Sequence, residues 1–451
     1  MVAKMLAAGK ILYSEVFNHH GPLIFVSGLV LELAGNYGIA AHRIPVMLLQ
    51  WVALGSIFAS PLLRPIHKTP YFILSAAVLT LYLPLIYGHM YLYQTVAGLF
   101  CVIILSQFVL PLILRPSLVK PLPVAAGAFL ISCLPFLAIT YLPVAALFLL
   151  ASCRRATLQQ TLIWAAIGTS INLLVLAYIG SYAGYLADHI YLNSQILPFY
   201  NDTPNFLAMV KLVFSYFLFK QNSILILLES GVVAAFLYKD PSNKSWRSIC
   251  IIVAVGSFLM RGNETHAIPF YYSMLALPMV ILTYRPAANF SVSIILLVLA
   301  SACVYKLSAP LDVDPKTAKR RIPDRSEFSD LAKKLTNKDD KIIVYSFANT
   351  EYILSDRMPA SGNFFLLPMQ VKYNENPKFG VKIDSCHDIK TYRPKLMFID
   401  KLKLWDKYDW STYGECVDKI IGSDYVQVPN KPFYVRRDIA ASHPAEFKSL
   451  N

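Results

Sequence analysis

The chain is organised around residues 9–35, GKILYSEVFNHHGPLIFVSGLVLELAG. Within a few residues this stretch places a carboxylate, an amide and two imidazoles, those of Glu15, Asn18, His19 and His20. A Gly-Pro step follows, and then an apolar run over residues 22–34 that would be about 20 Å long as a helix. The hydrocarbon core of a bilayer is about 30 Å thick. The run therefore predicts a helix lying in the membrane interface, with the polar cluster at its N-terminal end and Glu32 at an exposed position.

The composition is typical of a polytopic membrane protein. Apolar residues make up 56% of the chain, charged residues 15%, and the mean hydropathy is +0.49. Several apolar runs are long enough to cross a bilayer. The net charge is +14, but much of the basic surplus lies in short loops between apolar runs, where it sets membrane orientation. We therefore expect no nucleic-acid partner, and expect membrane lipids around the chain.

The apolar runs predict an α-helical polytopic membrane protein with about ten membrane helices, interfacial helices and a small C-terminal α/β domain. The predicted spans are 40–62, 71–87, 93–115, 122–136, 138–152, 160–182, 222–238, 246–260, 267–283 and 289–307. As one helix, residues 122–152 would be about 46 Å long, so we expect a short hairpin of two helices there. Basic residues lie in alternate loops, which places those loops in the cytoplasm.

The same charge bias places residues 1–39 and the tail after Leu307 on the outer side of the membrane. No helix precedes residue 1 to carry it across, so we expect a first helix and part of the first outer loop to lie upstream of this sequence. The outer side then collects the opening stretch, the loop 183–221, the short loop 261–266 and the tail. Within the second of these, residues 206–219 predict another interfacial helix.

Two domains are predicted: a transmembrane domain over residues 1–308 and an extracytoplasmic α/β domain over residues 309–451. In the second, strand patterns occur in KIIVYSF (341–347), KLMFID (395–400), YVQV and FYVRR. A helix is predicted over 324–336, with Asp324 or Ser326 as its N-cap. Cys386 and Cys416 are either bridged or free, and a bridge requires the tail to be extracytoplasmic.

Three polar clusters are candidate sites, each with a plainer alternative. The Glu15–His20 cluster is either a solvated loop or a contact for a lipid headgroup or a sugar. A zinc site there is disfavoured, because adjacent histidines seldom reach one metal. Arg261, Glu264 and His266, followed by Tyr271 and Tyr272, form either a loop salt bridge with interfacial tyrosines or a phosphate clamp. Gln94 belongs either to an aromatic belt or to a sugar-binding group.

Three sequence patterns resemble one family. They are ML..GK.LY.EVF.HHGPL with AHRI after it, Arg261…His266 followed by PFYY, and YSFANTEYILSDRMPAS at 345–361. Together they resemble GT-C superfamily membrane glycosyltransferases, with the greatest likeness to the bacterial group similar to lipid-A aminoarabinose transferases and protein O-mannosyltransferases. Residues 1–308 then correspond to the GT-C transmembrane domain.

The resemblance implies transfer of a sugar from a polyprenyl-phosphate donor to a lipid-linked or cell-surface acceptor, in the multi-pass setting of a bacterial inner (plasma) membrane. The reaction would take place at the outer face of that membrane. The family's first-loop Asp-Glu pair has no counterpart in these residues; the usual position of an acid holds Asn18, and Glu15 is the nearest acid. The implied catalytic residues are Glu15 and Asn18, and the implied substrate-binding residues are His19, His20, Gln94, Arg261, Glu264, His266, Tyr271 and Tyr272.

No metal ligands are assigned, and a divalent cation stays open as a cofactor. The rival functions are a non-catalytic membrane assembly or binding subunit and, less favoured, a lipid-linked sugar transporter. A transporter usually carries charged residues at membrane depth, whereas the predicted spans are almost free of charge, with Glu229 the main exception.

Overall fold

The structure is a computed structural model that describes residues 1–35, 41–82, 90–200, 268–284 except Met274, the single positions 294, 298 and 301, and 325–443. The chain forms two compact units. The mixed unit comprises Met1–His19, Ala177–Asp202 and Asp314–Asn451, and the helical unit comprises His20–Leu176 and Thr203–Val313. The predicted domain boundary at 308/309 lies outside the described residues. The description below takes each unit by itself.

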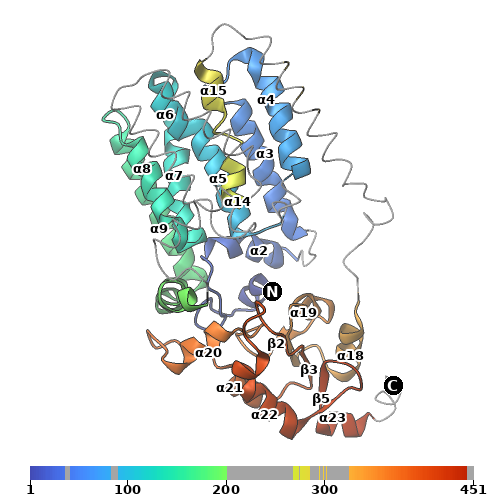
Figure 1. Ribbon diagram of the computed structural model, residues 1–451. Coiled ribbons are helices and arrows are strands. Elements are labelled where there is room, and N and C mark those ends of the chain that lie inside the picture. The colour runs from blue at the N-terminus through green and yellow to red at the C-terminus, as the bar shows by residue number, and fades with distance from the viewer. Residues whose placement is uncertain are drawn as a thin grey trace. The chain divides into compact units, whose positions relative to one another are not determined.

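The helical unit contains the helices labelled α2 to α9, α14 and α15 in Figure 1. In chain order these are α2 (Leu23–Leu33), η1 (Ala41–Arg43), α3 (Ile44–Phe58), α4 (Pro65–Ala77), η2 (Val78–Tyr82), α5 (Tyr93–Ile104), η4 (Leu105–Val109), α6 (Leu110–Leu114), η5 (Pro116–Leu118), α7 (Pro121–Leu137), η6 (Ile139–Tyr141), α8 (Leu142–Ser152), α9 (Leu158–Ile179), α14 (Ile268–Ser273) and α15 (Met279–Tyr284).

Helix α5 is the centre of this unit. In an apolar 18-residue stretch of the continuous helix Tyr93–Leu114, 83% of the residues are buried. Helices α3, α7 and α14 pack against α5. Close packing with α14 depends on Gly98, because a Cβ atom there would lie 2.7 Å from the ring of Tyr272. A side chain at position 98 would therefore force the two helices apart.

Within the described ranges, three helices are long and apolar enough to cross a membrane: Ala41–Ala59, Tyr93–Leu114 and Leu158–Ile179. In two of them, Ala41–Ala59 and Leu158–Ile179, only 22% of the residues of an 18-residue stretch are buried. These helices expose large apolar side chains such as Trp51 and Leu174. Exposed apolar helix surfaces of this kind suit contact with lipid better than contact with water. The structure is thus consistent with a helical membrane protein, and the count of ten spans stays a prediction.

The predicted hairpin over 122–152 is confirmed as two helices. Helix α7 ends at Leu137, Ala138 has extended backbone angles (φ −157°, ψ 134°), and the chain turns helical again at Ile139. The predicted span 160–182 begins slightly earlier and ends at Ile179.

Two other predicted spans need correction. The helix predicted at 71–87 begins at Pro65 and continues into the π-helix η2. The helix predicted over 267–283 is interrupted at residues 275–278, between α14 and α15, where Pro278 has no backbone N–H to donate. The spans predicted at 222–238 and 246–260, and nearly all of 289–307, lie outside the described residues, as does the interfacial helix predicted at 206–219.

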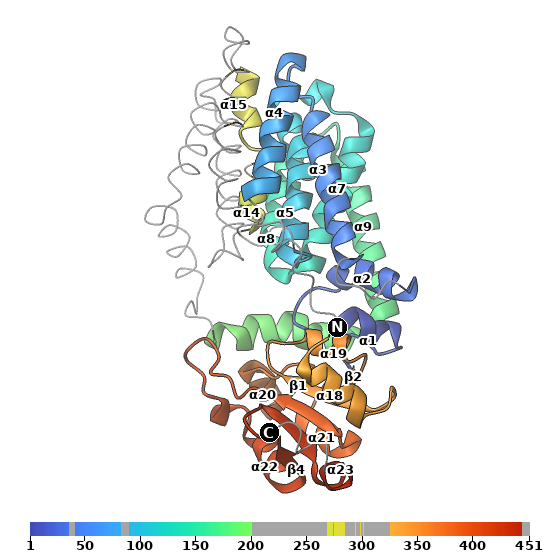
Figure 2. The ribbon, with the colours of Figure 1, turned by 90° about the vertical axis from the view of Figure 1, so that its right-hand side faces the viewer.

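The mixed unit contains helices and a small sheet. Its elements are α1 (Val2–Ala7), α10 (Tyr182–Gly184), the π-helix η7 (Tyr185–Ile196), η8 (Leu197–Phe199), α18 (Glu327–Leu335), β1 (Lys341–Tyr345), α19 (Thr350–Leu354), β2 (Met358–Pro359), α20 (Pro368–Glu375), α21 (Ser385–Tyr392), β3 (Leu396–Ile399), η9 (Trp410–Thr412), α22 (Glu415–Asp424), β4 (Tyr425–Gln427), β5 (Phe433–Arg436) and α23 (Arg437–Ser442). The strand order is β2-β1-β3-β5-β4, and helices flank the sheet in Figure 2.

All four predicted strand segments form strands, and the sheet gains β2, which is too short to show a pattern of its own. Strand β1 pairs in parallel with β2 and β3, whereas β5 pairs antiparallel with β3 and β4. The predicted helix at 324–336 is α18. Its N-cap is Ser326, whose hydroxyl accepts a hydrogen bond from the Ser329 backbone N–H, as is usual for a serine cap.

Two further features of the mixed unit bear on the site. Cys386 and Cys416 form a disulfide between α21 and the start of α22, so the bridged alternative is the one present. Residues 185–199, expected to belong to a loop, are instead helical in η7 and η8. A π-helix is uncommon and widens the turn, often at a functional position.

Candidate functional site

The opening segment forms a tight loop that fixes the carboxylate of Glu15. Tyr13 adopts a positive φ of 70°, which lets the chain turn back. Lys10 Nζ donates to Glu15 Oε1 at 2.7 Å and the Ile11 backbone N–H donates to Oε2 at 2.9 Å. These donors, with Lys10 the largest contributor, hold the pKa of Glu15 below its ordinary value. The carboxylate is therefore ionised at neutral pH, and its side chain is 39% exposed.

Phe17 and His19 are held in place by two other parts of the mixed unit. The Phe17 backbone N–H donates to the Gly362 carbonyl oxygen at 3.1 Å. The His19 carbonyl oxygen accepts from Nδ1 of His189 at 3.0 Å and from Nδ2 of Asn193 at 2.7 Å, both on η7. A Cβ atom at position 362 would lie 2.1 Å from the Glu15 carbonyl oxygen, so only glycine permits this approach.

Asp188 is the residue of this region that the sequence reasoning missed. It lies on η7, is 1% exposed, and accepts a hydrogen bond from the Asn18 backbone N–H. Its Oδ2 atom has no hydrogen-bond partner among the described residues. Burial raises the pKa of this carboxyl group well above its ordinary value, as expected when a charge would have to leave water. The only sequence signal was an acid beside a histidine, DHIYLN, within a predicted outer loop.

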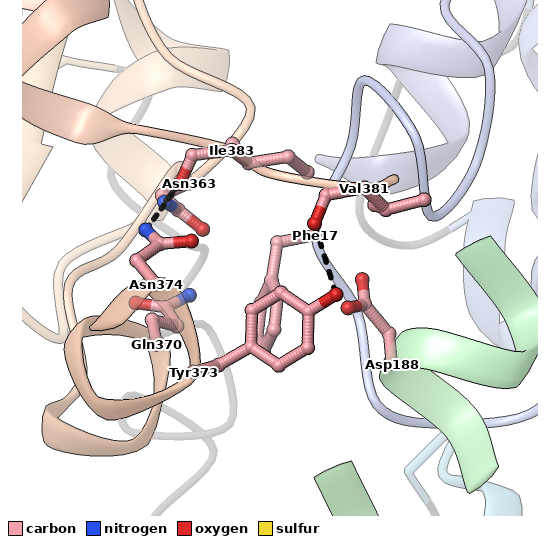
Figure 3. A pocket seen from close by; sticks show the side chains of 8 residues that line it. All are labelled: Phe17, Asp188, Asn363, Gln370, Tyr373, Asn374, Val381 and Ile383. Carbon is pink, nitrogen blue, oxygen red and sulfur yellow. Dashed lines mark hydrogen bonds between the residues drawn. The ribbon is translucent and has the colours of Figure 1, made fainter. Parts of the chain in front are cut away.

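Asp188 lines a small pocket within the mixed unit. The other lining residues are Phe17, Asn363, Gln370, Tyr373, Asn374, Val381 and Ile383. Figure 3 shows the three carboxamide groups on one side of the two aromatic rings and the Asp188 carboxyl group on the other. The free space is about the size of one water molecule. Three parts of the chain therefore build one polar pocket: the opening segment, η7 and the tail.

The predicted residues His20 and Gln94 belong to the helical unit. The His20 ring lies 4.5 Å from the ring of Tyr93, centroid to centroid. Gln94, next in sequence, is 6% exposed, and in the described part of the chain its Oε1 atom has no hydrogen-bond partner. The structure thus places His20 beside Tyr93, the residue before Gln94. Glu15, Asn18 and His19 belong instead to the mixed unit.

Glu32 is not at an exposed position, as the apolar run had suggested. It is 7% exposed, and Nε2 of His42 lies 3.0 Å from its Oε1 atom. The helix α2 itself forms as predicted. A buried carboxylate needs such a partner, because an unpaired charge in an apolar setting is costly. The AHRI motif therefore supplies, through His42, the partner of Glu32.

The remaining predicted site residues divide into two groups. Tyr272 is fully buried in the core of the helical unit, where Gln50 Nε2 donates to its hydroxyl oxygen at 3.2 Å. Arg261, Glu264, His266 and the side chain of Tyr271 lie outside the described residues. No group of three or more His, Cys, Asp or Glu side chains that could hold a metal ion occurs in the described part of the chain.

Comparisons with known proteins assign neither a family nor a function to the chain. No family model matches the chain, and neither a curated protein nor a solved structure is significantly similar to it.

Proposed function

We propose that this protein is a membrane glycosyltransferase that moves a sugar from a polyprenyl-phosphate donor to a lipid-linked or cell-surface acceptor. The observation that supports it best is which segments make up the mixed unit. The opening segment, residues 177–202 and the C-terminal sheet domain form one compact body. A disulfide within that body suits the extracytoplasmic side of a bacterial inner membrane. The three apolar helices suit a catalyst that works on lipid-linked substrates.

Glu15 is the proposed catalytic carboxylate. It is ionised, partly exposed and held in place by Lys10 and a backbone N–H, so it can accept a hydrogen bond, and then the proton, from an acceptor hydroxyl group as the phosphate leaves. A single displacement of this kind inverts the anomeric carbon. Asn18 is 7% exposed, and we assign it a positioning role through its backbone contact with Asp188.

The donor phosphate is proposed to be bound by imidazole and guanidinium donors, which suit phosphate oxygens. His19, His20, Arg261 and His266 have this chemistry, and Gln94, Glu264 and Tyr271 can bind sugar hydroxyl groups. Tyr272 is removed from this set, since its side chain is part of a packed core.

The test is transfer by the purified full-length protein in nanodiscs, with a radiolabelled polyprenyl-phosphate sugar and an extract of lipid-linked glycans as acceptor. We expect Glu15→Gln to lower the transfer rate about 100-fold or more, the range seen when a proton acceptor is lost. The matched control is Glu375→Gln, an exposed glutamate that pairs only with Lys372 among the described residues. Equal rates in both variants would remove Glu15 from the proposal, and no transfer by the unaltered protein would remove the activity.

A non-catalytic binding subunit is the second candidate. The observation that favours it is that both oxygens of Glu15 already accept hydrogen bonds within the opening loop. A binding subunit would retain the labelled donor lipid on gel filtration, yet release no product after prolonged incubation with acceptor.

A further inference from the structure

The pocket around Asp188 concentrates buried polar atoms that have no hydrogen-bond partner. Each of its four polar side chains other than the tyrosine carries one such atom: Asp188 Oδ2, Asn363 Oδ1, Gln370 Nε2 and Asn374 Oδ1. Buried polar atoms without partners are uncommon in folded proteins, and leaving one unpaired is unfavourable. Four of them around one pocket point to a ligand that would satisfy them.

The orientation of each carboxamide is fixed by its other partners. Asn363 Nδ2 donates to the Ile383 carbonyl oxygen at 3.0 Å, and Asn374 Nδ2 donates to the same oxygen at 2.7 Å. Gln370 Oε1 accepts from the Leu367 backbone N–H at 2.7 Å. The groups left for a ligand are therefore two amide oxygens, which accept, and one amide N–H group, which donates.

This mixture of donors and acceptors selects the class of ligand. Among the described residues, no Lys, Arg or His lines the pocket, which disfavours a phosphate or another anion. The N–H group of Gln370 disfavours a metal ion. A hydroxyl group both donates and accepts, so it can satisfy up to three of these atoms. It can donate to one amide oxygen and accept from Gln370 Nε2 and from Asp188, because burial favours the protonated carboxyl group.

The apolar lining fits the carbon atoms beside such a hydroxyl group. The hydroxyl oxygen of Tyr373 is already bonded to the backbone of Lys378 and Val381, which leaves its ring, with that of Phe17, to contact C–H groups. Figure 3 shows both rings between the polar ends of the pocket.

We propose that this pocket binds a hydroxyl or hydroxymethyl arm of a carbohydrate, with the sugar ring outside the water-sized space. The inference rests on the proposed function for the identity of the ligand as a carbohydrate. It is a binding site in the mixed unit and carries no catalytic role. A water molecule is the competing occupant.

Saturation-transfer NMR tests the proposal with the full-length protein in nanodiscs and no donor lipid. The probes are the methyl glycosides of glucose, galactose and mannose, each compared with its 6-deoxy analogue. We expect at least one parent glycoside to receive saturation chiefly at its hydroxymethyl protons, and its 6-deoxy analogue to bind about tenfold more weakly, because the polar atoms that the hydroxyl group would satisfy are then left unpaired.

Variants at Asp188 give an independent measurement. Asp188→Leu keeps the side-chain size but removes hydrogen bonding, and we expect it to weaken binding about tenfold. Asp188→Asn keeps a neutral donor and acceptor and should bind normally. Asp339→Leu, at an exposed position, is the control for the added apolar side chain.

Each outcome has one meaning. Binding that survives Asp188→Leu, or no binding by any glycoside, would show that the pocket holds water only. Loss of binding in Asp188→Asn would show that a charged carboxylate is needed, and would overturn recognition of a hydroxyl group. Because donor lipid is absent, failure here leaves glycosyl transfer to its own assay, and failure of transfer leaves a positive binding result intact.

Discussion

Two carboxyl groups of the mixed unit have opposite surroundings and therefore opposite pKa shifts. Lys10 and the Ile11 N–H hold the pKa of Glu15 low, whereas burial raises the pKa of Asp188. The contrast follows from position: Glu15 is partly exposed beside a cation, whereas Asp188 is buried beside two aromatic rings. Perturbed pKa values of this kind occur often at functional sites.

Asp188 predicts how stability depends on pH. Its pKa is raised in the folded state above the ordinary value of 3.8, so the folded protein holds a proton that the unfolded chain releases. Stability should therefore fall as pH rises from about 4 through the raised pKa, and the penalty should then stay constant. Asp188→Asn removes this penalty, so we expect the variant to have an equal or higher Tm than the parent at pH 7.5 and no advantage at pH 4.

The measurement is Tm by circular dichroism between pH 4 and pH 8. Tyr13 and Tyr373 interact with Asp188, and burial raises the pKa of both phenols, so neither titrates in this range. His189, next on η7, keeps Nδ1 on the His19 carbonyl oxygen and is present in both proteins. A difference in Tm that does not change with pH would contradict the assignment.

At the scale of elements, glycine contacts fix the opening segment. Gly362 lies against the backbone of Glu15 and accepts from the Phe17 N–H. Gly21 makes a similar contact in the helical unit, since a Cβ atom there would lie 1.9 Å from the Phe136 carbonyl oxygen. The His-His-Gly-Pro motif thus begins a segment whose entry into α2 requires close backbone contact.

We expect Gly362→Ala to destabilise the protein by about 1–3 kcal/mol, the usual cost of forcing an extra group into a packed site. Residues 11–19 should then exchange backbone hydrogens faster, because Glu15 must move away from position 362. Hydrogen exchange with mass spectrometry, together with urea unfolding, measures both effects.

The control for this change is Gly422→Ala in α22. A Cβ atom at Gly422 meets nothing within 4 Å, so alanine should be neutral or stabilise the helix by up to about 1 kcal/mol. If both alanine variants behave alike, the close approach at Gly362 is not what holds the opening segment.

At the scale of the whole molecule, the disulfide stabilises the C-terminal part of the mixed unit. Cys386 and Cys416 are 30 residues apart. Closing a loop of this length lowers the entropy of the unfolded chain and so raises the free energy of unfolding by about 3–4 kcal/mol. We expect the double variant Cys386→Ser/Cys416→Ser to show a lower Tm that no longer responds to a reductant. Cys153→Ser, which removes an exposed free cysteine, should leave the Tm unchanged. A parent protein whose Tm is insensitive to reduction would contradict the bridge.

The proposed function also predicts the side of the membrane on which the mixed unit lies. Single cysteines at Lys4 and at Lys338, in a background that keeps the Cys386–Cys416 disulfide and lacks the other cysteines, should react with a membrane-impermeant maleimide added to intact spheroplasts. The two positions belong to one compact unit, and Lys4 pairs with Asp356 at 2.7 Å. Labelling that requires broken membranes at either position would remove the extracytoplasmic site and the transfer reaction proposed for it.

Helix and strand positions were predictable because they depend on neighbouring residues. The break at Ala138 followed from the length of an apolar run, the start of α18 from a serine cap, and four strands from short apolar patterns. The interruption at residues 275–278 was missed, although Pro278 marks it. Helix η7 was taken for a loop because its polar residues interrupt the apolar pattern.

The candidate site was predictable only in part. The sequence by itself determined an apolar helical chain, a C-terminal α/β region and an unusual polar opening segment, because composition and local spacing carry that information. Only the tertiary structure decided that Asp188 is buried, that Glu32 is paired with His42, and that Asn363 and Asn374 share a pocket with Phe17. The physical reason is that burial and hydrogen-bond partners depend on residues far apart in the sequence. His19 and His189, for example, are 170 residues apart, and no local sequence pattern predicts their contact.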